Sequence, residues 1–120
     1  MFQLFSKPQI GGLSAADAVA GAKSGKVTVI DVREHGEVAM SGKAQGAKHI
    51  PLFQLAMRAD PSHPDYDKDL SPEQTICLYC ASGARSASAQ QVLKRLGYKD
   101  LHNLGNLNKW VKAGGKIVKS

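Results

Sequence analysis

The sequence predicts an α/β fold with a mainly parallel central sheet flanked by helices on both faces. Residues 27–32 are β-branched and almost wholly apolar, and residues 76–79 form a second short apolar run, as expected of strands buried on both faces. Patterns typical of helices alternate with these runs, and this alternation predicts parallel strands joined by helices. The 120 residues, 42% of them hydrophobic, predict one domain over residues 13–120 after a loosely ordered lead-in over residues 1–12.

The first half of the chain carries a local signal for each element. Ser14 is the expected cap of an Ala-rich helix that runs to about Lys23 and stops at Gly25. Residues 60–69 contain two prolines and four acidic residues, and they predict a loop. Between these segments we expect a short helix at residues 35–41, an extended segment at residues 47–51, and one or two helical turns at residues 52–58.

The second half begins with an amphipathic helix. Its apolar face is predicted from an i, i+3, i+4, i+7 pattern, formed by Ala89, Val92, Leu93 and Leu96. Gly97 is placed to end this helix. Three further elements are expected. They are a last parallel strand at residues 101–104, a helix at residues 107–113 with Trp110 in the core, and a short segment at residues 117–118 paired at the sheet edge.

Cys80 stands where the central strand ends and this helix begins. In an open α/β sheet, ligands bind at the carboxyl ends of the strands. A tight loop entering a helix directs backbone N–H groups toward an anion, and the helix dipole and nearby Arg85 favour thiolate over thiol. Two interpretations are therefore open for Cys80: a catalytic nucleophile, or a small residue at a turn.

The segment Cys77 to Cys80 spells C-x-x-C, but residues three apart on a strand point to opposite faces. We therefore expect Cys77 to be a buried apolar residue and not half of a redox pair. The four histidines lack metal-ligand spacing, so the sequence predicts no metal site and no cofactor.

Four stretches resemble the signatures of single-domain rhodaneses, a family of sulfurtransferases. The active-site loop of that family commonly reads Cys-x-x-Gly-x-Arg/Thr-Ser, and here the matching residues are Cys80, Ala81, Ser82, Gly83, Ala84, Arg85 and Ser86. The other matches follow the family's order at residues 31–34 with Glu37, at residues 46–52, and at Leu104, Gly105, Leu107, Trp110, Gly114 and Gly115. The similarity covers residues 13–118.

The resemblance implies a role for each of these residues. Cys80 would be the nucleophile, and residues 81–86 would bind the substrate through their backbone. Asp31 and Arg33 would hold the architecture near the loop. Arg85 has two open roles, contacting the anionic end of a donor or bracing the loop. Ala81 stands where many members of the family carry Arg or Lys.

The implied activity is transfer of a sulfane sulfur, from a donor such as thiosulfate to cyanide, a thiol or a protein, through a persulfide on Cys80. A sulfur carrier or interaction module that serves a protein partner is an alternative. Phosphatase or arsenate reductase chemistry is a second alternative, which related folds perform with a Cys-x5-Arg loop. Here Arg85 follows Cys80 after only four residues, which disfavours it because phosphate needs a wider cradle.

The excess of positive charge lies in the part of the sequence that follows Gly83. The net charge is +6, and residues 84–120 hold eight Lys or Arg residues and one acidic residue. This distribution suits attraction of a small anionic donor or an acidic partner, and a solvated basic surface is an equally good interpretation. We expect no nucleic-acid partner and no membrane partner, because no nucleic-acid motif and no apolar membrane span is present. No secretory signal is recognisable, so a cytoplasmic location is expected.

Overall fold

The computed structural model describes residues 13–119, so the predicted lead-in over residues 1–12 lies outside the described residues. The helices are α1 (Ala15–Ser24), α2 (His35–Ser41), α3 (Leu52–Arg58), α4 (Ala84–Arg95) and α5 (Leu107–Lys112). The strands are β1 (Val27–Asp31), β2 (Lys43–Ala44), β3 (Lys48–His49), β4 (Thr75–Cys80), β5 (Asp100–Asn106) and β6 (Ile117–Val118). Ser14 caps α1 as predicted, because its hydroxyl accepts a hydrogen bond from the Asp17 N–H at 3.1 Å.

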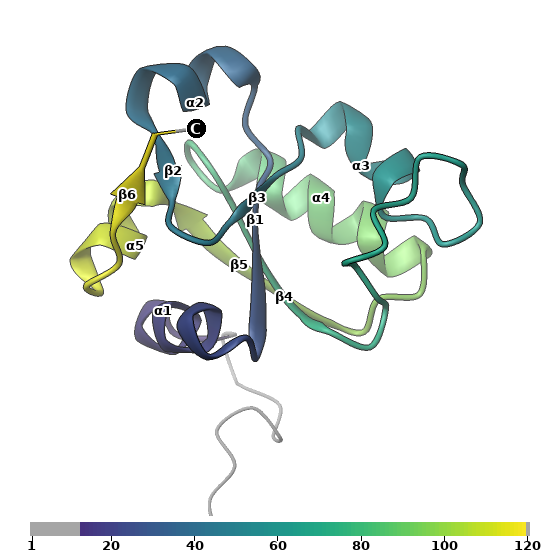
Figure 1. Cartoon of the computed structure of the whole chain (residues 1–120), viewed down its shortest axis with the longest axis horizontal. Helices are drawn as coiled ribbons and strands as arrows, with labels where there is room; N and C mark the ends of the chain where they lie inside the picture. Colours follow the sequence, from purple (N-terminus) through teal and green to yellow (C-terminus); the bar gives the residue numbers. More distant parts are fainter. Residues whose placement is uncertain (1–12, 120) are drawn as a thin grey trace, which may run out of the picture.

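The central sheet contains four strands in the order β3-β1-β4-β5, and every neighbouring pair is parallel. Helices α3 and α4 pack together on one face, and α1 and α5 pack together on the other (Figure 1). This arrangement confirms the predicted α/β class, with a mainly parallel sheet covered on both faces. Because these strands are parallel, the carboxyl ends of β1, β4 and β5 lie at one edge of the sheet.

The two faces of β4 form separate hydrophobic clusters because side chains alternate along a strand. Ile76, Leu78 and Cys80 face α3 and α4, whereas Cys77 and Tyr79 face α1 and α5. All five of these side chains are buried. The alternation predicted for the two cysteines is therefore present, and it directs only Cys80 toward the helix that follows β4.

The structure corrects the predicted place of residues 117–118. They do not extend the central sheet; β6 pairs antiparallel with β2 in a separate two-stranded sheet. The backbones of Gly42 and Val118 lie very close together here, since a Cβ on Gly42 would lie 2.6 Å from the Val118 carbonyl oxygen. Gly42 also has a φ of +77°, which favours glycine. Two-residue strands have too little hydrophobic pattern to show their partner in the sequence.

Strand β5 differs in length from the prediction. Strand β5 extends to Asn106, two residues beyond the predicted end, and its register to β4 shifts between Leu78 and Tyr79. Leu78 pairs with Asn103 and Tyr79 with Gly105, so Leu104 is an extra residue in β5. Among the described residues, no helix has the length and apolar character needed to cross a membrane.

Candidate active site

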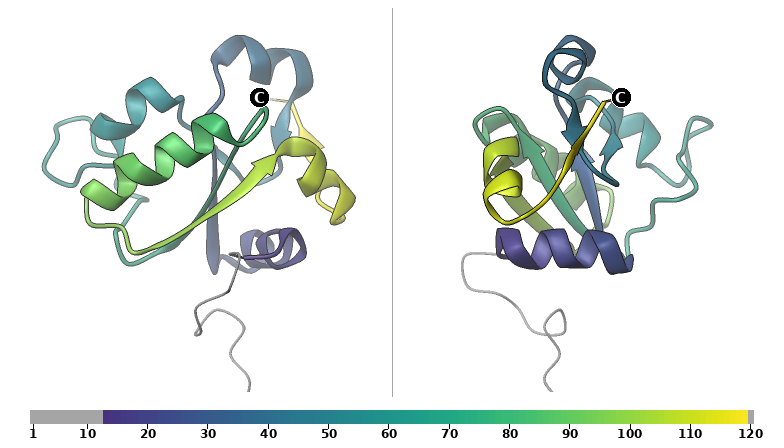
Figure 2. Two further views of the ribbon diagram at one scale, coloured as in Figure 1. Left: turned by 180° about the vertical axis from the view of Figure 1, so that it is seen from behind. Right: turned by 60° about the vertical axis from the view of Figure 1, so that its left-hand side comes forward.

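Cys80 is the last residue of β4, at the edge where the carboxyl ends of the parallel strands lie. It pairs with Asn106, the last residue of β5. Figure 2 (left) shows α4 in front of the sheet, with β5 as the edge strand beside it and the loop after β4 leading into the start of α4. The chain turns at Gly83, whose φ of +104° strains any residue with a Cβ, and α4 begins at Ala84. The loop therefore delivers the amino end of a twelve-residue helix to the Cys80 sulfur.

Backbone N–H groups converge on this sulfur. The Gly83 N–H donates to Cys80 Sγ at 3.0 Å and the Ser86 N–H donates at 3.4 Å. The Ser86 hydroxyl oxygen lies 3.5 Å from Sγ. Burial opposes ionisation of Cys80, but the hydrogen bonds from Ser86, Gly83 and Ser82 outweigh it and lower the pKa of the thiol to about 7. A substantial thiolate fraction is therefore present at neutral pH.

The predicted loop residues divide into an exposed rim and a buried base. Ala81, Ser82 and Ala84 are exposed, whereas Cys80 is 1% exposed and Ser86 is fully buried. The side chains of these three exposed rim residues are small and uncharged. The groups that contact the Cys80 sulfur are backbone N–H groups and the Ser86 hydroxyl.

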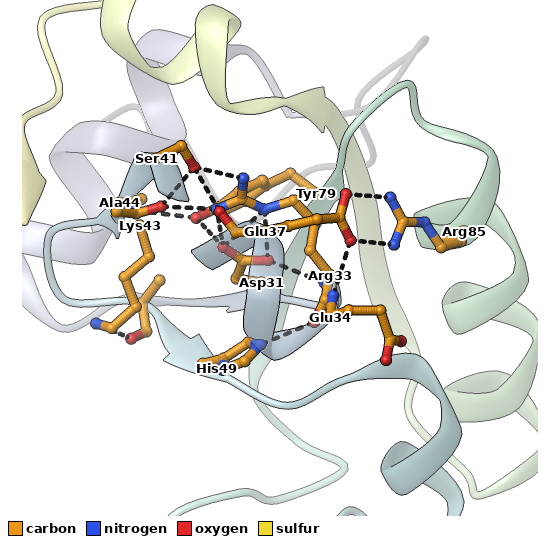
Figure 3. Close-up of polar contacts among 12 residues, drawn as sticks. Asp31, Arg33, Glu34, Glu37, Ser41, Lys43, Ala44, His49, Tyr79 and Arg85 are labelled. Atoms are coloured by element: carbon orange, nitrogen blue, oxygen red, sulfur yellow. Dashed lines mark hydrogen bonds and ion pairs between the residues drawn. The ribbon is translucent and has the colours of Figure 1, made fainter. Parts of the chain in front are cut away.

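Arg85 points away from the loop and toward α2. Its Nη1 and Nη2 atoms bind the Glu37 carboxylate at 2.6 and 2.8 Å, in a bidentate ion pair shown in Figure 3. This pair holds the pKa of Glu37 at about 2, with help from the Glu34 N–H, which donates to Oε1 at 2.9 Å. The pair ties α2 to the first turn of α4. Both ends of the Arg85 guanidinium fork are thus occupied by protein.

Asp31 and Arg33 form a buried network at the end of β1. The Arg33 guanidinium donates to Asp31, with Nη2 2.7 Å from Oδ2, and also to the Gly42 carbonyl oxygen at 2.7 Å. The Tyr79 hydroxyl donates to Asp31 Oδ2 at 2.7 Å and accepts from the Ala44 N–H at 2.9 Å. Figure 3 shows this network beside the Glu37–Arg85 pair. These contacts join β1 to β4 and to the end of α2, and neither charged group makes a hydrogen bond to the Cys80 loop.

Asn103 completes the surroundings of the loop, and the sequence prediction missed it. Its Nδ2 donates to the Gly83 carbonyl oxygen at 3.0 Å, and its Oδ1 accepts from the Ser86 hydroxyl at 2.7 Å. The available signal was a polar residue near the carboxyl end of the strand adjacent to Cys80. Assigning residues 101–104 to a strand did not by itself show that Asn103 contacts the Cys80 loop.

Cys77 lies on the opposite face of β4 from Cys80. It is fully buried, and this burial raises the pKa of its thiol to about 12. Among the residues that the structure describes, no group of three or more His, Cys, Asp or Glu side chains is placed to hold a metal ion.

Comparisons with known proteins identify the family of this chain. Residues 14–113 match the rhodanese-like domain family. An uncharacterised protein of Bacillus subtilis is 37% identical over 93 residues, which cover 77% of this chain and 64% of that protein. The thiosulfate sulfurtransferase PspE of Escherichia coli is 33% identical over 63 residues, which cover 52% of this chain and 55% of PspE. The chain thus spans less than two thirds of the length of each of these relatives.

A solved structure supports the same fold. A protein of unknown function from Rhodopseudomonas palustris, described as a possible tyrosine phosphatase, matches with a TM-score of 0.77 and 33% identity. The match covers 91% of this chain and 85% of the other. Since the family model covers most of the chain, the chain belongs to the family of rhodanese-like domains.

Proposed function

We propose that this protein transfers a sulfane sulfur through a persulfide on Cys80. In the first half-reaction, the Cys80 thiolate attacks the outer sulfur of a donor such as thiosulfate. A new bond forms between Sγ and that sulfur, the bond from the outer sulfur to the sulfonate group breaks, and sulfite leaves with the electron pair. In the second half-reaction, an acceptor thiolate or cyanide attacks the outer sulfur, and the Cys80 thiolate leaves.

The charge that moves to the outer sulfur needs hydrogen-bond donors that are already in place. The first N–H groups of a helix have no carbonyl partner four residues earlier. In α4 these include the N–H groups of Ala84 and Arg85, next to the pair from Gly83 and Ser86 that donates to Sγ. We assign Ala84 and Arg85 the role of binding the outer sulfur, as donors prearranged around a developing anion do.

The observation that carries the proposal is the convergence of two backbone N–H groups on one sulfur whose pKa is lowered to about 7. Such a thiol combines a useful thiolate fraction with good nucleophilicity at neutral pH. The low exposure of Cys80 favours a slim terminal sulfur as the reactant over a bulky group. A small anionic donor and a thiol or protein acceptor are therefore the expected partners.

A dedicated sulfur carrier uses the same Cys80 chemistry but receives and delivers sulfur only through a protein. Turnover with thiosulfate and a small acceptor separates the two functions, because a carrier that requires its partner stays inactive in such an assay.

Phosphatase chemistry is a poorer fit to this loop. The R. palustris protein, which has a similar fold, is described as a possible tyrosine phosphatase. Here the loop has four residues between Cys80 and Arg85, and both guanidinium N–H ends bind Glu37. A phosphate would find neither the wider cradle nor an unoccupied arginine fork.

The proposed function is tested by steady-state sulfur transfer from thiosulfate to cyanide or a thiol. We expect Cys80→Ser to abolish turnover and Cys77→Ser to retain most of it, because Cys77 lies on the far face of β4. Cys77→Ser is expected to cost stability, on the order of 1–3 kcal/mol if the buried hydroxyl is left unpaired. Loss of activity in both variants while both remain folded would contradict a single nucleophile.

A further inference from the structure

Asn103 lies on the face of β5 that is turned toward α4. Its side chain is exposed at the surface and reaches two groups of the Cys80 loop, the Gly83 carbonyl and the Ser86 hydroxyl. Leu101, two residues earlier, packs into the same cluster as Cys80, as the two-residue period of a strand requires. Asn103 itself makes no hydrogen bond to the sulfur among those of the described residues. Any influence on Cys80 must therefore pass through the loop.

The orientation of the Asn103 amide follows from its partners. The Gly83 carbonyl oxygen can only accept, so the Nδ2 group must face it, at 3.0 Å. The Oδ1 atom then faces the Ser86 hydroxyl, at 2.7 Å, where it can only accept. The Gly83 carbonyl also accepts from the Ala87 N–H at 3.0 Å, so both of its lone pairs have a donor without the Ser86 hydroxyl.

The Ser86 hydroxyl oxygen also lies 3.1 Å from the Gly83 carbonyl oxygen, but that carbonyl already accepts from Asn103 Nδ2 and the Ala87 N–H. The single hydroxyl proton then has two further acceptors. One is Asn103 Oδ1 at 2.7 Å, and the other is Cys80 Sγ at 3.5 Å. When Cys80 is a thiol, its S–H can donate to the Ser86 oxygen while the hydroxyl donates to Asn103. When Cys80 is a thiolate, Sγ becomes a charged acceptor and competes with Asn103 for the same proton.

We propose that Ser86 and Asn103 form a two-position hydroxyl switch, in which the Ser86 O–H turns to Cys80 Sγ when that sulfur is charged and returns to Asn103 Oδ1 when it is not. Asn103 is then a positioning residue. It offers the Ser86 hydroxyl an alternative acceptor, and it holds the Gly83 carbonyl so that the Gly83 N–H stays directed at Sγ.

This switch rests on the proposed sulfur transfer for its part in the reaction. Before attack, the hydroxyl stabilises the Cys80 thiolate. Once the outer sulfur is bound, Sγ is a neutral bridging sulfur and a weak acceptor, so the Ser86 proton returns to Asn103. When the acceptor removes the outer sulfur, charge reappears on Sγ and the hydroxyl turns again. The hydroxyl thus stabilises Cys80 as attacking group and as leaving group without stabilising Sγ in the persulfide.

A double-mutant cycle on the pKa of Cys80 tests the switch. The ultraviolet absorbance of the thiolate is followed from acid to mildly alkaline pH in wild type, Asn103→Ala, Ser86→Ala and the double variant. Cys80→Ser supplies the baseline, and Cys77 stays protonated in this range because its pKa is about 12. No sulfur donor enters the experiment, so a failure here is distinct from a failure of the proposed function.

Asn103→Ala removes the competing acceptor, so it should favour the thiolate when Ser86 is present and lose this effect when Ser86 is Ala. A hydrogen bond of ordinary net strength corresponds to a difference of about three- to tenfold in the thiolate-to-thiol ratio between the two backgrounds. Loosening of the Gly83 carbonyl affects both backgrounds and cancels in the comparison. Asn103→Ala also frees a lone pair on that carbonyl, 3.1 Å from the Ser86 hydroxyl, but this neutral acceptor competes with a charged sulfur less well and only reduces the expected difference. Asn108→Ala, an exposed asparagine of α5, is the matched control and should leave the ratio unchanged.

The same ratio change in both backgrounds would overturn the switch, since Asn103 would then act only as a brace of the loop. Asn103→Asp provides an independent variant if Asn103→Ala does not fold. Its carboxylate holds the hydroxyl more strongly, so the thiolate should be disfavoured more with Ser86 present than with Ala at that position. The direct repulsion between Asp and thiolate is common to both backgrounds, and an equal effect in both would again contradict the proposal.

Discussion

Glu37→Gln separates the two roles that the sequence leaves open for Arg85. The Glu37 carboxylate occupies both ends of the guanidinium fork, at 2.6 and 2.8 Å. We propose that Arg85 braces the loop by tying α4 to α2. The substitution keeps the size and one acceptor oxygen of the side chain but removes the charge. If Arg85 is a brace, the substitution should therefore weaken the contact between α2 and α4, while the loop N–H groups that face Cys80 stay in place.

The magnitude follows from geometry and exposure. A bidentate charge-assisted pair is among the stronger polar contacts, but these side chains are 33% and 35% exposed, so solvent screens their attraction. We expect Glu37→Gln to lower the free energy of unfolding by about 1 kcal/mol, the upper end for exposed pairs. The melting temperature of a domain of this size should fall by about 4 °C.

The pH dependence of this loss has a defined sign. The pKa of Glu37 is lowered from 4.5 to about 2, first by the hydrogen bond from Arg85. Its stabilising effect is therefore fully present above pH 4.5 and is lost as the pH falls toward about 2. The stability difference between wild type and Glu37→Gln should disappear over the same interval.

The assay combines denaturant unfolding with kinetics of sulfur transfer at low salt. Glu73→Gln is the control, because it makes the same charge change on an exposed side chain near the opposite end of β4. If Arg85 is a brace, Glu37→Gln and Arg85→Gln should each cost about 1 kcal/mol and the double variant little more. The KM for thiosulfate should be unchanged in Glu37→Gln. A KM that falls severalfold would refute this reasoning, since it would show that freeing Arg85 frees a donor-binding group.

Three further predictions concern the donor, the buried network and the loop length. Ala81→Arg should lower the KM for thiosulfate about fivefold at low salt and less at high salt, because the exposed position 81 offers this dianion no charge; an unchanged KM at low salt would show that Ala81 does not limit donor binding. Asp31→Asn should destabilise the fold by about 3 kcal/mol in denaturant unfolding, because it leaves Arg33 buried without its counter-charge, whereas a loss below about 1 kcal/mol would mean that water replaces the pair. Aryl phosphates should not be turned over, and a phosphatase activity that survives purification and vanishes in Cys80→Ser would contradict the loop-length argument.

Much of the fold was predictable because strong local patterns mark the elements of the central sheet. The buried runs of β1 and β4, and the apolar face of α4, each follow one period over several residues. The alternation along β4 also predicted that Cys77 and Cys80 face opposite ways, as they do. Cys80 could be placed at the sheet edge for the same reason, since its position depends only on where the strand ends.

The parts that were missed depend on contacts between distant residues. The pairing of β2 with β6 joins two-residue strands far apart in the chain, and such short strands carry no period. The position of Asn103 depends on the register of β5 against β4 and on the extra residue at Leu104. The direction of Arg85 could not be read either, because Glu37 lies 48 positions earlier in the sequence.

The most direct test of sulfur transfer at Cys80 is the intact mass of the protein after incubation with thiosulfate and removal of the donor. We predict a species heavier by one sulfur atom in wild type and in Cys77→Ser, its disappearance on addition of cyanide, and its absence in Cys80→Ser. A wild-type mass that never changes, with thiosulfate or with a persulfide donor, would contradict the proposed function. An adduct of the same mass in Cys80→Ser would place the chemistry on another residue.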